Sequence, residues 1–283
     1  MTAAPAPPRP EGAKSEGAKW GDLGPRVLSA LVLVPLTLLA IWLGGWVFAA
    51  VVAAIVSGLA TEWLGLCGMR NRAGAVLPFA VLPAAVLLTA AGLPRTALLL
   101  VAVGMIGAGI AGGGLSAARP LGFGIPYLGL APVALAWLRL APQAGLVNVL
   151  VLLVTVWASD IGAYAVGRAV GGPKLAPSIS PGKTWSGAIG GLAAAALTGL
   201  IACLVLGGVH PGRAAAIALL IGLVAQLGDL FESRLKRHFG VKDSGSLIPG
   251  HGGLLDRLDA VLAAAPAGAL LVLVLGRGVI LWQ

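Results

Sequence analysis

Apolar residues in this chain form long continuous runs separated by short polar segments, and they do not alternate with polar residues. Runs of this length are typical of membrane-spanning helices, and their continuity disfavours the strands of a membrane barrel. The pattern therefore predicts an all-α fold, a polytopic integral membrane helix bundle of about nine transmembrane helices. The predicted spans are residues 27–43, 46–66, 76–92, 96–111, 121–138, 145–166, 185–207, 213–231 and 258–276.

Composition agrees with this prediction. Hydrophobic residues make up 58% of the chain, charged residues 10%, and the mean hydropathy is +0.98, outside the usual range of soluble domains. Residues 1–25 are rich in Pro, Ala and Gly and cannot bury a core, so we expect a disordered cytoplasmic tail. The first apolar run begins too far along the chain for an ordinary signal peptide, which predicts a retained span. We divide the remainder into N-terminal transmembrane helices, 26–140, and a C-terminal transmembrane region, 141–283.

The positions of Lys and Arg predict the orientation. With the N-terminus in the cytoplasm, fifteen of the nineteen basic residues fall on the predicted inner side, as the positive-inside rule requires. Two long polar loops, 167–184 and 232–257, then lie on the cytoplasmic face. The net charge of +9 is not arranged as a basic stripe with interleaved aromatics. We therefore expect the bilayer and anionic ligands as partners, and no nucleic acid.

Several other features favour structural roles. Cys67 and Cys203 have no metal-ligand spacing and are interpreted as small core residues. The small residues of 189–200 are interpreted as a helix-packing surface. Most of the eight Trp residues fall near predicted span ends, as in an interfacial belt. Glu62, near the end of the second span, is interpreted as structural.

Carboxylates gather at the ends of two predicted spans. Asp229 is followed by Glu232 and Ser233 on the same helical face, and Asp256 and Asp259 repeat the three-residue spacing at the start of the last span. Unpaired carboxylates at a membrane edge are costly, so these groups need cations. Carboxylates that share a site with phosphates suit Mg²⁺. Salt bridges to Lys236 and Arg257 are the alternative, and spacing does not decide between them.

The segment between these two helix ends suits phosphate. Lys236, Arg237 and Lys242 offer cationic donors, and Gly252 and Gly253 allow the backbone to approach an anion closely. His251 could donate to a phosphate or transfer a proton, although a His in a glycine turn is as often structural. This composition favours a phosphate-binding function over a simple membrane-edge loop.

A second polar group lies upstream. Asp160 is placed inside an apolar run without a local partner, which marks a functional candidate, with a hydrogen bond to a neighbouring helix as the alternative. Ser178, Ser180, Lys183 and Thr184 could line a phosphate or nucleotide pocket. For Lys183, a lysine that extends from the membrane edge to water is the alternative.

The stretch 233–259, S-R-L-K-R-H-F-G-V-K-D-S-G-S-L-I-P-G-H-G-G-L-L-D-R-L-D, closely resembles the C-terminal signature of the phosphatidate cytidylyltransferases, also called CDP-diacylglycerol synthases. The matching residues are Ser233, Lys236, Arg237, Lys242, Asp243, His251, Gly252, Gly253, Asp256, Arg257 and Asp259. Upstream, S-D-I-G-A-Y and I-S-P-G-K-T-W-S-G resemble two further family motifs, with Ile161, Gly182 and Ser186 as departures.

The resemblance implies Mg²⁺-dependent transfer of a cytidylyl group from CTP to phosphatidic acid, giving CDP-diacylglycerol and pyrophosphate for phospholipid biosynthesis. It implies one or two metal ions held by Asp229, Asp256 and Asp259. It also implies a homodimer, with several passes through the cell (inner) membrane and a cytoplasmic active site. The implied catalytic residues are Asp229, Lys236, Arg237, Lys242, Asp243, His251, Asp256 and Asp259, and the implied substrate-binding residues are Asp160, Ser180, Lys183, Ser233, Gly252, Gly253 and Arg257.

Two other classes of function remain open. A CTP-dependent enzyme could act on another membrane lipid, such as an isoprenoid chain or a polyprenol. A transporter could use Asp160, Asp229 and Asp259 as a proton or cation path. The crowding of acids at one face and the absence of a visible repeat between the halves disfavour the transporter.

Overall fold

A computed structural model describes residues 23–69, 73–111, 115–248, 252–276 and 280–283. Within these ranges the chain forms nine α-helices, one short 3₁₀ turn (η1, Ala73–Ala75) and one two-stranded antiparallel hairpin. The helices are α2 (Leu23–Leu43), α3 (Gly45–Leu66), α4 (Val76–Ala90), α5 (Pro94–Ala111), α6 (Leu115–Arg139), α7 (Gly145–Val170), α8 (Trp185–Val205), α9 (Pro211–His238) and α10 (Leu255–Leu275). The strands are β1 (Lys174–Ala176) and β2 (Ser180–Thr184).

These helices confirm the predicted all-α polytopic bundle. In the described part of the chain, seven of them are long and apolar enough to cross a membrane, and α4 and the 31–43 part of α2 are shorter apolar helices. The short hairpin is an addition that periodicity does not predict. Residues 1–22 of the predicted tail lie outside the described residues, and 23–25 already belong to α2, so that end of the predicted tail is wrong.

The predicted boundaries of the two polar loops are also wrong in part. Helix α7 continues to Val170, α9 continues to His238, and α10 already begins at Leu255. Hydropathy marks where the apolar run stops, whereas a helix continues as long as its backbone is hydrogen-bonded. As a consequence, Asp229, Glu232, Lys236 and Asp256 are all helical residues.

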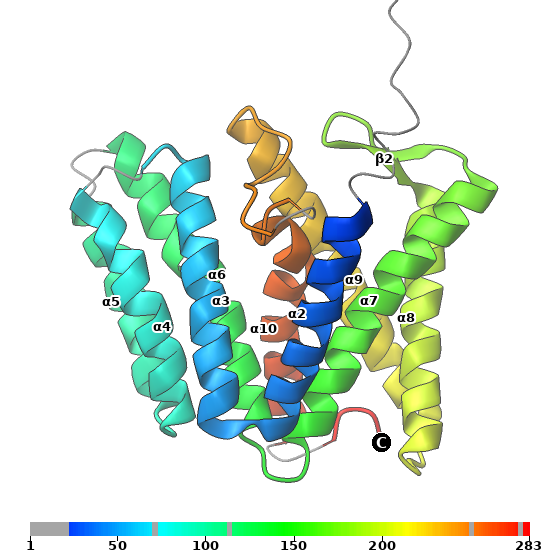
Figure 1. Cartoon of the computed structure of the whole chain (residues 1–283). Helices are drawn as coiled ribbons and strands as arrows, with labels where there is room; N and C mark the ends of the chain where they lie inside the picture. The colour runs from blue at the N-terminus through cyan, green and yellow to red at the C-terminus, as the bar shows by residue number, and fades with distance from the viewer. Residues whose placement is uncertain (1–22, 70–72, 112–114, 249–251, 277–279) are drawn as a thin grey trace, which may run out of the picture.

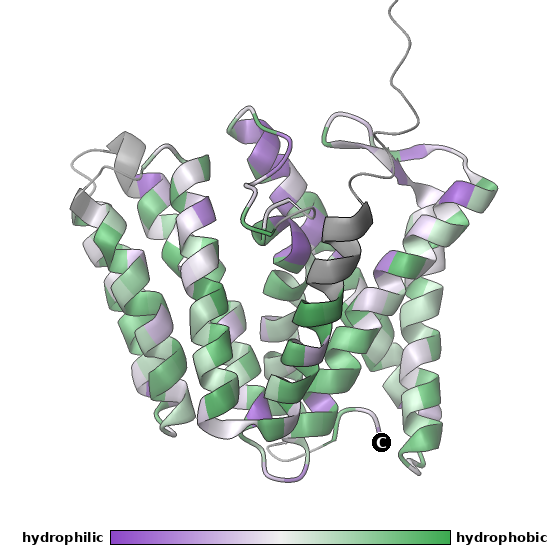
Figure 2. Cartoon of the chain, viewed as in Figure 1, coloured by the Kyte–Doolittle hydropathy of each residue, from purple (hydrophilic) through white to green (hydrophobic). Residues whose placement is uncertain are grey.

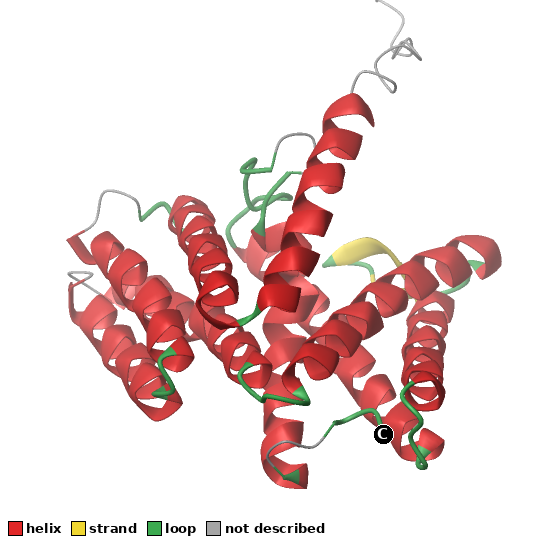
Figure 3. Ribbon diagram, turned by 60° about the horizontal axis from the view of Figure 1, so that its bottom comes forward, coloured by secondary structure: helices red, strands yellow, loops and turns green. Residues whose placement is uncertain are grey.

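Helices α4 and α5 lie at one side of the molecule and α7 and α8 at the other, with α2, α9 and α10 between them (Figures 1 and 3). Helix α10 packs against α9 and α6, so it joins the C-terminal helices to the N-terminal ones. Helices α7 and α8 pack closely because small residues face each other: a Cβ on Gly191 would lie 2.7 Å from the Ser159 carbonyl oxygen. This contact supports the packing interpretation of the glycine-rich segment. The domain division at 140 and 141 stays a prediction.

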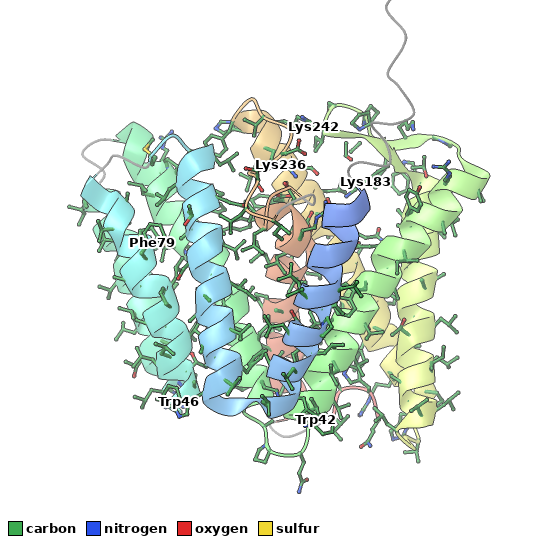
Figure 4. All side chains as sticks on the ribbon, in the orientation of Figure 1. Trp42, Trp46, Phe79, Lys183, Lys236 and Lys242 are labelled. Carbon is green, nitrogen blue, oxygen red and sulfur yellow. The ribbon has the colours of Figure 1, made fainter. Side chains whose placement is uncertain are left out.

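The hairpin and the segment between α9 and α10 lie at one end of the bundle, the end where α2 begins (Figure 1). Hydrophilic residues are concentrated at this end and hydrophobic ones along the helices (Figure 2). Lys183, Lys236 and Lys242 lie here, whereas Trp42 and Trp46 lie at the opposite end (Figure 4). We call the lysine-bearing end the polar end. The two Trp side chains are exposed, consistent with the interfacial positions expected from the sequence.

Both cysteines are free. Cys203 is completely buried, and Cys67 packs against the hydrophobic core, where burial raises the pKa of its thiol to about 12. A thiol with such a pKa stays neutral at physiological pH and behaves as a small apolar group. The core interpretation of the two cysteines agrees with this placement.

Candidate active site

A pocket of about 430 Å³ opens between α7, α8, α9 and the hairpin at the polar end. We call it the α7–α9 pocket. It combines apolar walls with several charged or polar side chains. Its lining residues include Asp160, Tyr164, Arg168, Lys183, Thr184, Gln226 and Asp229.

An ion pair lies at the centre of this lining. Lys183 Nζ on β2 is 2.5 Å from Asp229 Oδ2 on α9, and the two side chains are 29% and 27% exposed. Asp160 on α7 interacts electrostatically with both of them. The Ser233 hydroxyl donates to Asp229 Oδ1 at 3.4 Å, one helical turn away. The structure thus brings together four predicted site residues, and Lys183 does not simply extend into water.

Local sequence explains how Lys183 is positioned. The antiparallel hairpin pairs Lys174 with Thr184, and the chain then enters α8 directly. The Thr184 hydroxyl accepts a hydrogen bond from the Gly187 amide at 3.1 Å and so caps the N-terminus of α8. Because Lys183 immediately precedes this cap, its backbone is held between a strand and a helix end.

A second polar cluster lies one to two turns further along α9, near its C-terminal end. Lys236 Nζ lies 2.6 Å from Asp256 Oδ1 and 3.0 Å from Glu232 Oε2. Asp256 also accepts hydrogen bonds from the amides of Ser244 and Gly253. The Ser244 hydroxyl donates to Glu62 Oε2 at 3.2 Å. We call these residues the loop network: Glu62, Glu232, Lys236, Ser244, Gly253 and Asp256.

The loop network is closed to solvent. The side chains of Lys236, Asp256 and Glu232 are 12%, 13% and 1% exposed. A Cβ on Gly253 would collide with the Ser244 hydroxyl and lie 2.7 Å from Asp256 Oδ2, so this position requires glycine for space. The sequence left the metal site and the salt bridge open as alternatives, and here Asp256 forms the salt bridge to Lys236.

Asp259 connects the two clusters. It lies on α10, and electrostatic interactions link it to Asp229, Glu232 and Asp160. Its Oδ1 also accepts a hydrogen bond from the Ala260 amide at 2.7 Å. Four carboxylates from three helices therefore influence one another at the polar end.

The predicted metal trio is not assembled as such. Among the described residues, no three Asp, Glu, His or Cys side chains lie close enough to form a metal site. The oxygens of Asp256 are instead bound by Lys236 and by the Ser244 and Gly253 amides, as described above. Nevertheless, Glu232 is fully buried, and its only close partner among the described residues is Lys236, whose Nζ lies 3.0 Å from Oε2, so Oε1 has no partner there. A buried carboxylate with one unpartnered oxygen and three acidic neighbours fits a nearby divalent cation.

The remaining predicted residues are spread along the polar end. Arg237 donates to the Ile179 carbonyl at 3.3 Å and to the Val241 carbonyl at 3.2 Å, so it ties α9 to the hairpin. Lys242 and Asp243 are exposed in the α9–α10 segment, and Arg257 is exposed on α10. Ser180 pairs with Ala176 at the start of β2, outside the lining residues of the α7–α9 pocket.

Two further predicted residues lie near the break in the described chain. Gly252 has a φ of +85°, which favours glycine, and forms a bridge with Ile248. His251 lies outside the described residues. The role of His251 therefore stays a prediction from the resemblance.

Sequence reasoning missed four residues of the site. Tyr164 and Arg168 follow Asp160 at four-residue intervals on the pocket face of α7, and Arg168 donates to the Tyr164 hydroxyl at 3.1 Å. Gln226 precedes Asp229 by three residues and donates to Ser159 and Ala188. These three residues could have been found from the sequence, because each lies at helical spacing from Asp160 or Asp229, on the same helix face.

The fourth missed residue is Tyr127 on α6. Its buried hydroxyl has no hydrogen-bond partner among the described residues and interacts electrostatically with Glu232 and Asp259. Its ring belongs to an aromatic cluster with Trp63, Phe123 and Phe231. This cluster packs α9 against α3 and α6, and its tyrosine could not be identified from local spacing.

These observations define a class: a polytopic helical membrane protein with a lysine- and carboxylate-lined pocket at one end of its bundle. Comparison with known proteins specifies the family. A family model described as the cytidylyltransferase family matches residues 24–275. The chain belongs to this family.

Named relatives agree along most of the chain. The phosphatidate cytidylyltransferase of Brucella suis is 40% identical over 245 residues, which cover 86% of this chain and 91% of the relative. The enzyme of the same name from Pseudomonas aeruginosa is 40% identical over 268 residues, 89% of this chain and 98% of the relative. That from Haemophilus influenzae is 48% identical over 130 residues, 44% of this chain and 45% of the relative.

Proposed function

We propose that this chain is a phosphatidate cytidylyltransferase, which transfers a cytidylyl group from CTP to phosphatidic acid. The products are CDP-diacylglycerol and pyrophosphate. The observation that carries the proposal is 40% identity, over most of the chain, to relatives of that name. The fold and the site are consistent with it, because a lipid substrate and a charged nucleotide meet where apolar helices end in a polar pocket.

The reaction requires positioning and charge neutralisation more than a strong base. A phosphatidate oxygen attacks the α-phosphorus of CTP, a new P–O bond forms, and the α–β bridging bond breaks to release pyrophosphate. A phosphomonoester with a second pKa of about 6 is largely dianionic at neutral pH and can attack without prior deprotonation. The enzyme must hold two anions together and neutralise the negative charge on pyrophosphate as it leaves.

The α7–α9 pocket offers groups for these tasks. Lys183 and Arg168 are its basic lining residues and can bind phosphate oxygens. Asp229 forms an ion pair with Lys183 and so fixes the position of its ammonium group. In this proposal the pocket binds the phosphates of CTP or of the lipid, and Lys236, Arg237 and Lys242 contribute positive charge from the adjoining helix end and loop.

Mg²⁺ is part of the proposal. When bound, it would neutralise phosphate charge and align the triphosphate. Asp229 and Asp259 fit as ligands because they interact across two helices, and the resemblance adds Asp256. For Asp256 to bind metal, Lys236 would have to release it, since its Nζ lies 2.6 Å from Asp256 Oδ1. Asp160 and Glu232 are the neighbouring carboxylates that could complete or support such a site.

Membrane placement follows the same reasoning. We place the polar end at the cytoplasmic face of the cell membrane, because the Lys and Arg bias and access of CTP both favour it. The homodimer implied by the resemblance stays a prediction, which the mass of the detergent-solubilised protein would test.

The test of function is label transfer. Purified protein in detergent would be incubated with phosphatidic acid and CTP radiolabelled at its α-phosphate, with and without Mg²⁺. We expect Mg²⁺-dependent appearance of label in the organic phase. Folded protein that transfers no label to phosphatidic acid would contradict the proposal, and phosphorylated isoprenoids and free polyprenols would then be tested as acceptors.

A further inference from the structure

Glu62 is a buried carboxylate in the N-terminal half of the chain, far in sequence from the site residues. It lies near the end of α3 and is 3% exposed. Burying a carboxylate in a membrane protein is costly unless several donors satisfy it. The donors of Glu62 therefore indicate what the residue does.

The three donors come from the segment between α9 and α10 and from the first residue of α10. Oε1 accepts a hydrogen bond from the Leu254 amide at 2.8 Å, and Oε2 accepts from the Leu255 amide at 2.8 Å. The Ser244 hydroxyl donates to Oε2 at 3.2 Å. Glu62 thus contacts an interior residue and the C-terminal end of the segment that contains most of the family signature.

The two leucine amides belong to the N-terminus of α10, where backbone donors lack intrahelical partners. Leu254 is the N-cap position and offers no side-chain cap of its own. Glu62 replaces that cap from another helix, with a negative charge at the end that the helix dipole favours. Asp256 lies in the first turn of the same helix, so Glu62 anchors the helix end that carries Asp256.

The contact continues to Asp256 and Lys236. The Ser244 amide donates to both oxygens of Asp256, at 3.2 Å and 3.1 Å, while the Ser244 hydroxyl donates to Glu62. Asp256 in turn binds Lys236. A Cβ on Gly245 would lie 2.8 Å from Glu62 Oε1, so the loop is packed directly on the carboxylate. Ser244 therefore couples Glu62 to Asp256 and Lys236.

We propose that Glu62 is a positioning residue of the cytidylyl transfer: it holds Ser244 and the start of α10 so that Asp256 and Lys236 keep their catalytic arrangement. This inference rests on the proposed function. It gives the N-terminal helices a part in the chemistry, through α3, although the family signature lies entirely in the C-terminal half. A purely structural Glu62 would affect stability and leave turnover by the folded protein unchanged.

The test compares Glu62→Gln with wild type. Glutamine keeps the volume but replaces one carboxylate oxygen with an NH2 group that cannot accept a hydrogen bond, so at least one of the Leu254 and Leu255 amides loses its acceptor and the negative charge is removed. We expect kcat to fall about 10-fold to 100-fold, with KM for CTP changed less than about threefold, because misplaced groups slow the reaction without removing the binding pocket. Hydrogen exchange at the amides of 244–256 should accelerate.

Two further variants make the result specific. Thr61→Ala is the control: Thr61 precedes Glu62 on α3 and donates to Ser57 within the same helix, so kcat and loop exchange should match wild type. Ser244→Ala removes one donor and keeps the Ser244 amide on Asp256. We expect it to lower kcat by a smaller factor and to have little further effect when combined with Glu62→Gln, because both act through one contact.

The outcomes separate the two proposals. Folded Glu62→Gln protein with wild-type kcat and unchanged loop exchange overturns the positioning role, whereas wild type without any label transfer overturns the proposed function. In that second case loop exchange in Glu62→Gln still tests the anchor, and unchanged exchange contradicts it. If Glu62→Gln does not fold, Ser244→Ala decides, and wild-type kcat in that variant overturns the proposal.

Discussion

The α7–α9 pocket and the loop network contain the same pair of side chains in opposite settings. Lys183 and Asp229 are 2.5 Å apart, and Lys236 and Asp256 are 2.6 Å apart. The first pair is about one quarter exposed and faces a pocket of about 430 Å³. The second is nearly buried and is surrounded by further hydrogen bonds.

This difference in setting indicates a difference in role. An exposed pair is weakly held, so its lysine can exchange a carboxylate for a phosphate at little cost. A buried pair with satisfied neighbours is costly to separate. We therefore interpret the pocket pair as the one that substrate phosphates contact first, and the network pair as one whose side chains are held in a fixed arrangement beside the pocket.

The largest effect is expected when the pocket loses its lysine. Lys183→Met should lower cytidylyl transfer by about 100-fold or more, because it removes a charge that neutralises phosphate in the transition state. Unfolding stability should change by less than about 1 kcal/mol, since the pair is partly exposed. Label transfer and thermal unfolding in detergent measure the two effects.

The matched control for this prediction is Lys174→Met. Lys174 is an exposed lysine on the partner strand of the same hairpin, outside the pocket lining. The Lys174→Met variant should transfer the cytidylyl group at the wild-type rate. Equal losses in the two variants would mean that general positive charge at the polar end matters, and the distinction between the two regions would fail.

A second prediction compares the two aspartates directly. Asp256→Asn should destabilise the protein by about 1–3 kcal/mol, because Lys236 and the Ser244 and Gly253 amides lose a charged acceptor in a buried site. Asp229→Asn should cost less than about 1 kcal/mol. The midpoint of thermal unfolding in detergent provides the comparison.

The Mg²⁺ dependence of cytidylyl transfer provides a second comparison of the two aspartates. If Asp256 also binds Mg²⁺, Asp256→Asn should raise the Mg²⁺ concentration needed for half-maximal transfer, in addition to its effect on stability. An unchanged Mg²⁺ dependence in folded, active protein would remove Asp256 from the metal site. Equal stability losses for the two aspartate variants would contradict the difference in burial on which the comparison depends.

The fold was largely predictable because membrane helices are marked by long apolar runs. The nine predicted spans correspond to α2 through α10, and the errors lie at their polar ends. Hydropathy could not show that α9 runs on to His238, and this extension places Lys236 on a helix beside Glu232. The β1–β2 hairpin was missed because three and five residues are too few for a reliable strand pattern.

The site was predictable where the family signature or helical spacing marks residues, as for Asp229, Lys236 and Asp256. It was not predictable where contacts join distant segments. The residues next to Glu62 in the sequence do not indicate that it accepts hydrogen bonds from the Leu254 and Leu255 amides, which lie near the other end of the chain. Spacing also could not decide whether Asp256 binds a lysine or a metal, because that depends on side-chain placement in three dimensions.

The smallest expected effect concerns the cap that holds the pocket lysine. Thr184→Ala removes the hydroxyl that accepts from the Gly187 amide at 3.1 Å and should cost about 1 kcal/mol of stability. Thr184→Ser keeps the hydroxyl and should stay close to wild type in thermal unfolding. Since Lys183 immediately precedes the cap, KM for CTP should rise a few-fold in Thr184→Ala and stay unchanged in Thr184→Ser. If the serine variant is as unstable as the alanine variant, packing of the threonine methyl, and not the cap hydrogen bond, stabilises this end of α8. The pocket would then depend on close packing, as the loop network does.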